Sequence, residues 1–295
     1  PYYDKNADGS LGKMHYEGNE YPDYVPITSW EEYNVSVRCP DVAYIHNPYD
    51  NANKVTSVHP GFYAKELKKH VGLLVYIPYF ITSGDVPGHL CVLPGTMYAD
   101  RVIVATEREK SAYIKEFGKF EAENNCTGLF GNPEEKFLAL GSPKTDKVLG
   151  TTRENISVPK AWQDLIIKPD GSRKPVILYN TTIQPLLHHK EVYLEKMEAV
   201  FSFFYEKRDE YTLLWRPHPL MESTVSSMLP YLHERYKRLV NDYRERAFGI
   251  YDDTADLHRA IALSDAYYGD KGSLAVLYKE TGKPCMIQDV KVKIT

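Results

Sequence analysis

The chain has 295 residues, which is enough for two domains of about 150 residues, each with its own core. Its formal charge is −4, from 36 basic and 40 acidic side chains, and 43% of its residues are hydrophobic. This near-neutral balance excludes the strongly basic nucleic-acid-binding domains, so no nucleic-acid partner is expected. No apolar run reaches the ~18 residues of a membrane span and no secretory leader is evident, so we expect a cytoplasmic protein.

Several common motifs are missing from the sequence. The four cysteines form no C-x-x-C pair, so neither a disulfide framework nor a zinc site is predicted, and a reducing compartment fits best. Neither H-E-x-x-H nor paired D-x-D occurs, so no metal site is expected. No G-x-G-x-x-G follows a strand and no G-x-x-x-x-G-K-[ST] occurs, so we expect neither a cofactor nor a P-loop.

In the first half, short apolar runs alternate with helical patterns. Strands are predicted at 42–45, 73–77, 101–105 and 137–140, and helices around 59–70 and 107–118. This alternation is typical of a parallel α/β sheet. Residues 1–24 lack a clear period and are predicted to be a loop or part of an incomplete leading unit. The start at Pro1 rather than Met is compatible with a fragment of a longer protein.

The second half repeats this plan after a Pro- and Gly-containing segment, 150–174, which we interpret as a linker. Strands are predicted at 176–179, 211–215, 248–251, 266–268 and 285–287, and helices at 188–209, 222–240, 253–263 and 272–281. Asp252-Asp253-Thr254 is expected to cap the third of these helices. We therefore predict an α/β protein of two Rossmann-like domains, 1–150 and 151–295, that face each other across a cleft.

The junction between the strand at 266–268 and the following helix is the strongest indication of function. It consists of Asp270, Lys271, Gly272 and Ser273. Free N–H groups and the positive end of the helix dipole favour an anion at such a helix start, and Lys271 and Ser273 add donors. An ordinary βαβ crossover whose polar turn faces water is the alternative.

A second strand, 211–215, is followed by Arg216-Pro217-His218-Pro219. Ligands of open α/β sheets bind beyond the carboxyl ends of the strands, where Arg216 and His218 are expected to emerge. Arginine offers a planar fork to phosphate, and histidine can donate a hydrogen bond or move a proton near neutral pH. In the alternative interpretation, Arg216 pairs with a local acid and His218 caps the strand.

With these motifs in place, the chain resembles the CDP-glycerol glycerophosphotransferases, GT-B-fold enzymes that build teichoic-acid-type polymers. In that family a strand ends in Arg-Pro-His, similar to Arg216-Pro217-His218, and an Asp-x-Ser-Ser-type turn grips the nucleotide diphosphate, similar to 270–273. The family's Gly-x-Pro-Arg-x-Asp motif is similar to 141–146, with Lys144 at the Arg position, and its Leu-Tyr-x-Pro-Thr strand is similar to 177–182. The likeness covers about residues 95–289.

This resemblance implies a transferase that moves glycerol phosphate, or another polyol phosphate, from a CDP-activated donor to a hydroxyl acceptor in surface-polymer synthesis. In catalysis Arg216 would help to neutralise the diphosphate and the leaving CMP, and His218 would contact the transferred phosphoryl oxygens. The nucleotide and its phosphates would bind at Lys144, Thr181, Thr182, Asp270, Lys271, Gly272 and Ser273. The acceptor could be lipid-linked, which would bring the protein to the inner face of the membrane; the oligomeric state is not indicated.

One departure from the family concerns the base. The family has a His-Gly-Thr turn after a strand of its first domain, and the comparable strand at 74–80 has no such histidine. His46 and His59, both beyond the strand at 42–45, are candidate replacements, and either could equally be a core or loop histidine. Two other functions stay open: a nucleotide-sugar glycosyltransferase or epimerase of the same fold, and a non-catalytic nucleotide-phosphate-binding module.

Overall fold

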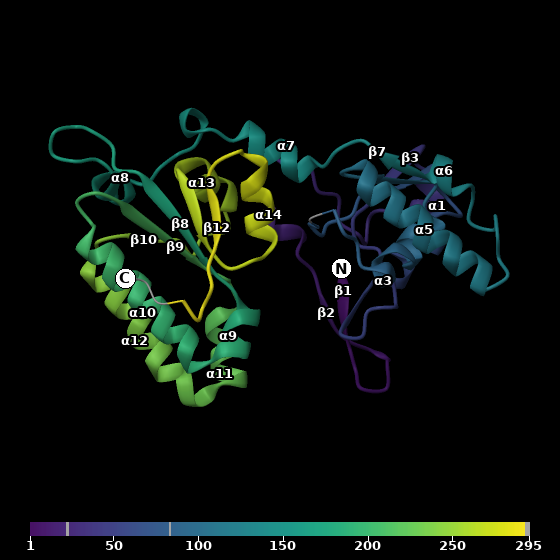
Figure 1. The fold of residues 1–295 in the computed structure, drawn as a ribbon. Helices are drawn as coiled ribbons and strands as arrows, with labels where there is room; N and C mark the ends of the chain where they lie inside the picture. The colour runs from purple at the N-terminus through teal and green to yellow at the C-terminus, as the bar shows by residue number, and fades with distance from the viewer. Residues whose placement is uncertain (22–23, 83, 293–295) are drawn as a thin grey trace. The chain divides into compact units, whose positions relative to one another are not determined.

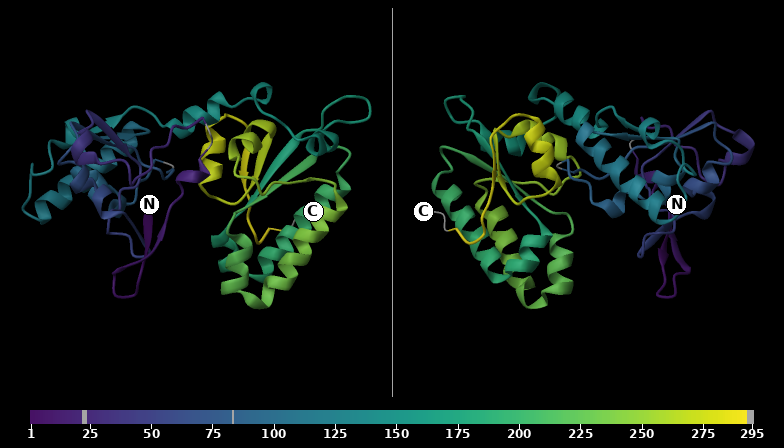
Figure 2. Two further views of the ribbon diagram at one scale, coloured as in Figure 1. Left: turned by 180° about the vertical axis from the view of Figure 1, so that it is seen from behind. Right: turned by 45° about the vertical axis from the view of Figure 1, so that its right-hand side comes forward.

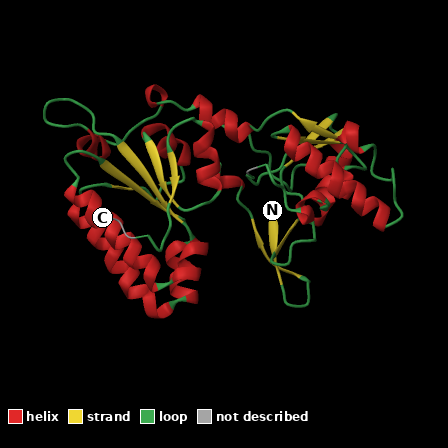
Figure 3. Ribbon diagram, in the orientation of Figure 1, coloured by secondary structure: helices red, strands yellow, loops and turns green. Residues whose placement is uncertain are grey.

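The computed structural model describes residues 1–21, 24–82 and 84–292. The chain divides into two compact units, Pro1–Ser142 and Pro143–Thr295. Each unit has a parallel β-sheet covered by helices, as Figure 3 shows. The division lies at the start of α7 (Pro143–Gly150), and the segment predicted as a linker lies within the second unit. A cleft between the units stays a prediction.

The first unit is built on a four-stranded parallel sheet of order β3-β5-β6-β7. Its strands are β3 (Val42–Ile45), β5 (Leu73–Tyr76), β6 (Arg101–Val104) and β7 (Phe137–Ala139), where they were predicted. The helices are α1 (Val35–Arg38), α2 (Ala64–Leu67), α3 (Gly88–Cys91), α4 (Pro94–Tyr98), α5 (Glu107–Glu123) and α6 (Pro133–Lys136).

The long helix α5 packs against the parallel sheet of the first unit and covers its core. Thr106 caps it by accepting a hydrogen bond from the amide of Glu109. Tyr113 and Phe117 lie one turn apart on its buried face, and their ring centroids lie 5.2 Å and 5.5 Å from that of Phe137 on β7.

Two expectations for the first unit are wrong. Part of the segment 1–24, predicted as a loop, pairs into an antiparallel sheet of order β2-β1-β4: β1 (Tyr2–Lys5), β2 (Leu11–His15) and β4 (Thr56–Val58). The helix predicted around 59–70 is instead a 3-10 turn, η2 (Pro60–Phe62), followed by α2, because Tyr63 between them is extended.

The second unit has a five-stranded parallel sheet of order β10-β9-β8-β11-β12. Its strands are β8 (Val176–Thr181), β9 (Thr212–Pro217), β10 (Ile250–Tyr251), β11 (Ala266–Gly269) and β12 (Cys285–Ile287), close to the predicted positions. The helices after α7 are α8 (Lys160–Ile166), α9 (Ile183–His189), α10 (Glu191–Glu206), α11 (Met221–Met228), α12 (Pro230–Arg246), α13 (Leu257–Leu263) and α14 (Ser273–Glu280).

The helices predicted at 188–209 and 222–240 are each interrupted. Lys190, with φ of +50°, separates α9 from α10. Pro230 begins α12 because proline has no N–H to donate and fits the first helical position. α14 ends as predicted: Gly282, just beyond its C-cap Thr281, has φ of +70°.

The sheet of the second unit has a topological switch point. From β8 the chain proceeds to β9 and β10 on one side, with α9–α12 on one face of the sheet, as Figures 1 and 2 show. From β11 it proceeds to β12 on the other side, with α13 and α14 on the opposite face. The strand order therefore reverses between β8 and β11. In open α/β sheets the ligand crevice forms beyond the carboxyl ends of the strands at such a point.

Candidate functional site

The carboxyl ends of β8 and β11 meet at Asn180 and Gly269. A Cβ on Gly269 would lie 2.4 Å from the backbone oxygen of Asn180, so no side chain fits where the two strands approach. The Asn180 side chain donates to the backbone oxygen of Arg216 at 2.8 Å, which joins β9 to the same edge. The switch point is therefore a tightly fixed backbone junction.

Asp270, the next residue after β11, braces this junction. It is 2% exposed, and its carboxylate accepts hydrogen bonds from the amide and hydroxyl of Thr182 at 2.6 and 3.0 Å. It also accepts from Gln288 Nε2 at 2.7 Å and from the Tyr193 hydroxyl. Burial, and secondly the charge on Asp270, raises the pKa of Tyr193 well above its usual range, so this hydroxyl stays a donor.

These contacts correct the expected roles of Asp270 and Thr182. Protein donors from α10, from the residue after β8 and from the segment after β12 occupy the carboxylate, which therefore positions the turn. A direct phosphate contact by Asp270 would also oppose two negative charges. Thr181 is likewise internal: it is fully buried, and its hydroxyl accepts from Trp215 Nε1 at 3.0 Å.

The turn after Asp270 has the geometry of an anion cradle. Gly272 is the N-cap of α14, and within the described chain no side chain caps this helix. The amides of Ser273, Leu274 and Ala275 have no hydrogen-bond acceptor among the described residues. Lys271 and Ser273 are exposed beside them. Three free donors at the positive end of a helix dipole therefore lie at the switch point.

Arg216 does not emerge beyond its strand, because β9 continues through Pro217. It is 8% exposed; its Nη1 lies 2.5 Å from Asp252 Oδ2 and its Nη2 donates to the backbone oxygen of Thr254 at 2.8 Å. The alternative interpretation, a pair with a local acid, is the one observed. Asp252 consequently does not cap α13; Asp256 does, by accepting from the amide of Arg259 at 3.0 Å.

His218 is half-buried directly after β9. Its amide donates to the backbone oxygen of Thr181 at 2.8 Å, and its Nδ1 accepts from the amide of Leu220 at 3.2 Å. In the neutral ring the proton therefore lies on Nε2. Burial lowers the pKa of His218 below its usual value, which favours that neutral form. His218 thus caps the turn after β9 and offers one donor.

Lys144 lies on α7, which packs against α13 and α14 within the second unit. Burial lowers the pKa of Lys144. The structure thus packs α7, which carries Lys144, against α13 and α14, the helices that follow β10 and β11.

The two histidines proposed as bases lie on different sheets of the first unit. His46 follows β3 at the carboxyl edge of the parallel sheet and lines a 410 Å³ cavity. His59 follows β4 of the antiparallel sheet, where its Nδ1 accepts from the amide of Gly61 at 3.1 Å. Its ring packs 4.9 Å from Trp30. His59 therefore caps a turn in an aromatic cluster, as its alternative interpretation as a loop histidine describes.

Sequence reasoning overlooked a Gly-Thr pair in the first unit. Pro94-Gly95-Thr96 begins α4 and contains a Gly-Thr pair that follows a helix, α3, and not a strand. A Cβ on Gly95 would lie 2.6 Å from Pro48 Cα, which explains the glycine. Thr96 is fully buried, and its hydroxyl has no partner in the described part of the chain. The turn therefore has no imidazole.

Sequence reasoning also missed His258, the second residue of α13. Its Nδ1 is buried without a hydrogen-bond partner among the described residues, and so is Nε of the adjacent Arg259. Burial lowers the pKa of His258, and the positive charges of Lys147 and Arg216 lower it further, against the opposing effect of Asp256. Because buried polar atoms are normally paired, these two are candidates for ligand contacts. The available signal was a His-Arg pair near the start of the helix that follows a predicted strand.

In residues 1–21, 24–82 and 84–292, no group of three or more His, Cys, Asp or Glu side chains is placed to hold a metal ion. Over the same residues, every helix falls short of the length and apolarity needed to cross a membrane.

Solved structures of other proteins are similar to this chain in fold. The putative UDP-N-acetylglucosamine 2-epimerase from Listeria monocytogenes aligns with a TM-score of 0.53 and 16% identity, over 86% of this chain and 59% of that one. The UDP-GlcNAc 2-epimerase of Methanocaldococcus jannaschii, in complex with UDP-GlcNAc and UDP, aligns with a TM-score of 0.50 and 13% identity, over 84% of this chain and 60% of that one. The wall teichoic acid polymerase TagF aligns at a TM-score of 0.41 and 15% identity, over 75% of this chain and 54% of that one.

Identities this low show a shared fold and leave the activity open. The first two likenesses confirm the predicted fold class, an α/β protein with two Rossmann-like units of the GT-B type. The chain spans about three fifths of the length of both epimerases. No protein-family model matches the chain, and no curated protein matches its sequence. The resemblance to CDP-glycerol glycerophosphotransferases therefore rests on the short motifs alone.

Proposed function

We propose that the second unit binds the diphosphate of a nucleotide-activated sugar or polyol at the switch point between β8 and β11. The observation that supports this most is the uncapped start of α14, where three amides have no acceptor among the described residues, at the edge where such sheets bind ligands. The chain would act as a nucleotide-sugar epimerase or glycosyltransferase. The fold likeness to two UDP-GlcNAc 2-epimerases supports this choice as an analogy.

The electrostatics of the turn suit a leaving nucleotide. Negative charge accumulates on the diphosphate as the bond to the sugar breaks, and fixed amide dipoles stabilise that charge without rearranging. Lys271 adds a positive charge, and Nε2 of His218 adds a neutral donor. Arg216 is a positioning residue here, because its charge is already matched by Asp252 and it ties β9 to the segment after β10.

A CDP-activated polyol donor is the second candidate. The order of Lys144, Arg216-Pro217-His218 and the turn at 270–273 supports it, since these resemble the motifs of that family. The lack of a His-Gly-Thr turn after the strand at 74–80 counts against that family's proton transfer. A lipid-linked acceptor at the inner membrane face belongs to this second candidate, and so does polymer synthesis. A nucleotide-binding module without turnover remains the third candidate.

The amide N–H of Ser273 gives a test of the proposed anion site at the start of α14. Ser273 is the first residue of α14 after an extended Gly272, so Ser273→Pro fits the helix start and removes one amide donor. Ser273→Ala is the matched control, because it loses the hydroxyl and keeps the amide. We expect Ser273→Pro to weaken UDP or CDP binding about tenfold or more in isothermal titration, and Ser273→Ala to change it less.

The nucleotide preference distinguishes the candidates. Tighter binding of UDP than CDP, with turnover of a UDP-sugar, supports the first candidate, and tighter binding of CDP supports the second. Binding without turnover of either donor class supports the third. Equal affinity of the Ser273→Pro variant and the wild type for every nucleotide would contradict the assignment of the cradle.

A further inference from the structure

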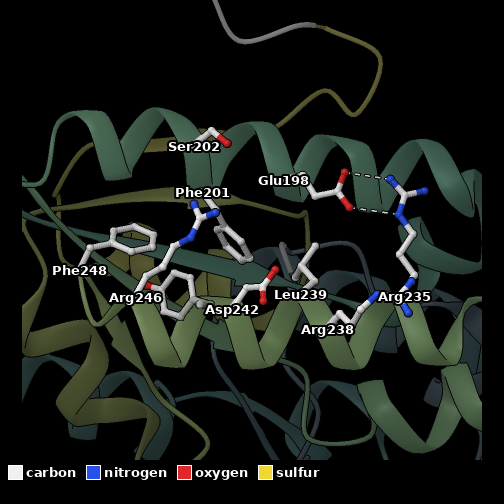
Figure 4. A pocket seen from close by; sticks show the side chains of 10 residues that line it. Glu198, Phe201, Ser202, Arg235, Arg238, Leu239, Asp242, Arg246 and Phe248 are labelled. Carbon is white, nitrogen blue, oxygen red and sulfur yellow. Dashed lines mark hydrogen bonds and ion pairs between the residues drawn. The ribbon is translucent and has the colours of Figure 1, made fainter.

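A groove lies between α10 and α12, away from the carboxyl edge of the sheet. Its volume is about 330 Å³, which is within the range of small-molecule sites. Side chains of both helices line it, and Phe248, which follows α12, lines its end, as Figure 4 shows.

The floor of the groove is apolar and firmly held. Phe201, Leu239, Tyr243 and Phe248 line it, and each is less than one tenth exposed. The ring centroids of Phe201 and Tyr243 lie 4.7 Å apart, and those of Tyr243 and Phe248 lie 4.9 Å apart. The Tyr243 hydroxyl donates to the backbone oxygen of Leu213 at 2.9 Å, which fixes the ring to the sheet. Such a floor suits a flat apolar body.

One end of the groove is closed by an ion pair. Arg235 on α12 donates from Nε and Nη2 to the two carboxylate oxygens of Glu198 on α10, at 3.1 and 2.8 Å. Figure 4 shows this bridge between the helices. The charges of this pair match each other, and Arg238 on α12 lines the groove beside it.

At the other end the groove is lined by Arg246 and Asp242. Asp242 precedes Arg246 by four residues, the orientation in which a helical ion pair is favoured, yet the described residues form no such pair. The Arg246 side chain instead extends from α12 toward α10 in Figure 4. Its guanidinium lies 5.3 Å from the Tyr205 ring, and Arg208 lies 4.5 Å from the same ring. Within the described chain neither arginine has a carboxylate at ion-pair distance.

We propose that this groove binds a small amphipathic anion. A flat apolar body would lie on Phe201 and Leu239, and its sulfonate, carboxylate or phosphate group would pair with Arg246. The exposed hydroxyl of Ser202 on α10 lies at the same groove and adds a donor. This site is independent of the proposed nucleotide cradle.

The test uses 8-anilinonaphthalene-1-sulfonate, an aromatic sulfonate, titrated into the full chain and followed by its fluorescence. Arg246→Gln removes the anion partner, and Ser202→Trp fills the groove from an exposed position. Lys237→Gln is the matched control, since it removes an exposed charge from α12 outside the groove. N-phenyl-1-naphthylamine, which lacks the sulfonate, reports on the apolar floor alone.

We expect one saturable site whose dissociation constant rises about tenfold in Arg246→Gln and which is lost in Ser202→Trp. Lys237→Gln should bind as the wild type does, and Arg246→Gln should keep its affinity for the uncharged dye. Circular dichroism confirms folding of each variant. Unchanged sulfonate affinity in Arg246→Gln overturns the anion assignment, and unchanged affinity in Ser202→Trp overturns the groove itself.

Discussion

The Tyr193 hydroxyl on α10 donates a hydrogen bond to the buried carboxylate of Asp270 at the end of β11. The two residues are 77 positions apart in the chain. Their contact joins a helix on one face of the sheet to the turn that begins the helix on the other face. The start of α14 is therefore held by the core of the second unit.

Removing this hydroxyl should cost stability and disturb the cradle together. In Tyr193→Phe the carboxylate keeps its bonds from Thr182 and Gln288 but loses one donor in a buried site, which costs about 1–3 kcal/mol of unfolding free energy. Urea denaturation measures this loss, and Tyr211→Phe at an exposed tyrosine is the control. A Tyr193→Phe protein as stable as the wild type would show that Asp270 does not depend on α10.

The buried pair of Arg216 and Asp252 gives a second prediction. Removing one partner leaves the other charge buried, so Arg216→Met should lower the unfolding free energy by about 3–5 kcal/mol. The double variant Arg216→Met/Asp252→Leu should recover part of that loss, which a double-mutant cycle in urea measures. If Arg216→Met stayed fully stable and lost only nucleotide affinity, Arg216 would be a ligand contact after all.

This pair also shows how far the sequence could lead. Local pattern was sufficient for the parallel strands and for the start of α14, because Gly272 and the apolar run after it are adjacent in the chain. The partner of Arg216 was not predictable, since Asp252 lies 36 positions away and comes into contact only through the pairing of β9 with β10. The same limit applies to Asp270, whose donors come from the residue after β8, from α10 and from the segment after β12.

Interruptions of helices were harder to predict than helices. The break at Lys190 depends on a positive φ that nothing in its neighbours requires, and the pattern on both sides stays helical. In the first unit, Ala64 begins α2 because Asp50 accepts a hydrogen bond from its amide at 2.9 Å across the fold. A long-range cap of this kind leaves no local signal.

Lys136 gives a prediction on pH. It is 2% exposed, and its Nζ donates to the backbone oxygens of Met97, Ala99 and Phe130 at 2.6 to 2.8 Å. Burial lowers the pKa of Lys136 to about 8, below its ordinary value of 10.5. Between these values the unfolded chain binds more protons than the folded one, so the contribution of Lys136 to stability rises with pH.

The comparison is between the wild type and Lys136→Met, which has no titrating group at this position. Their difference in unfolding free energy should grow by about 1–2 kcal/mol in favour of the wild type between pH 7.5 and 9.5. Urea titrations at both pH values measure it. A difference that stayed constant, or that shrank with pH, would contradict the lowered pKa.

His258 gives the last prediction, which rests on the proposed nucleotide site. Its Nδ1 has no partner within the described residues, so replacing the ring by Phe removes an unpaired polar atom and keeps a planar side chain. Stability in His258→Phe should therefore change by less than about 1 kcal/mol. If the imidazole completes the nucleotide site, the same change should weaken nucleotide binding severalfold. Because burial lowers the pKa of His258, the ring is neutral at pH 7, and wild-type affinity should stay flat between pH 7 and 8.

Calorimetric titration of His258→Phe and of the wild type with the preferred nucleotide, at pH 7 and pH 8, measures the loss of affinity and its pH dependence. Thermal unfolding measures the stability of the variant and is the control for folding. His233→Phe on α12, which lies outside the proposed site, is the matched variant. Equal nucleotide affinity in His258→Phe and wild type would remove His258 from the site and leave the cradle at α14 untouched. A destabilised His258→Phe protein would instead mean that Nδ1 has a partner, such as a bound water, within the fold.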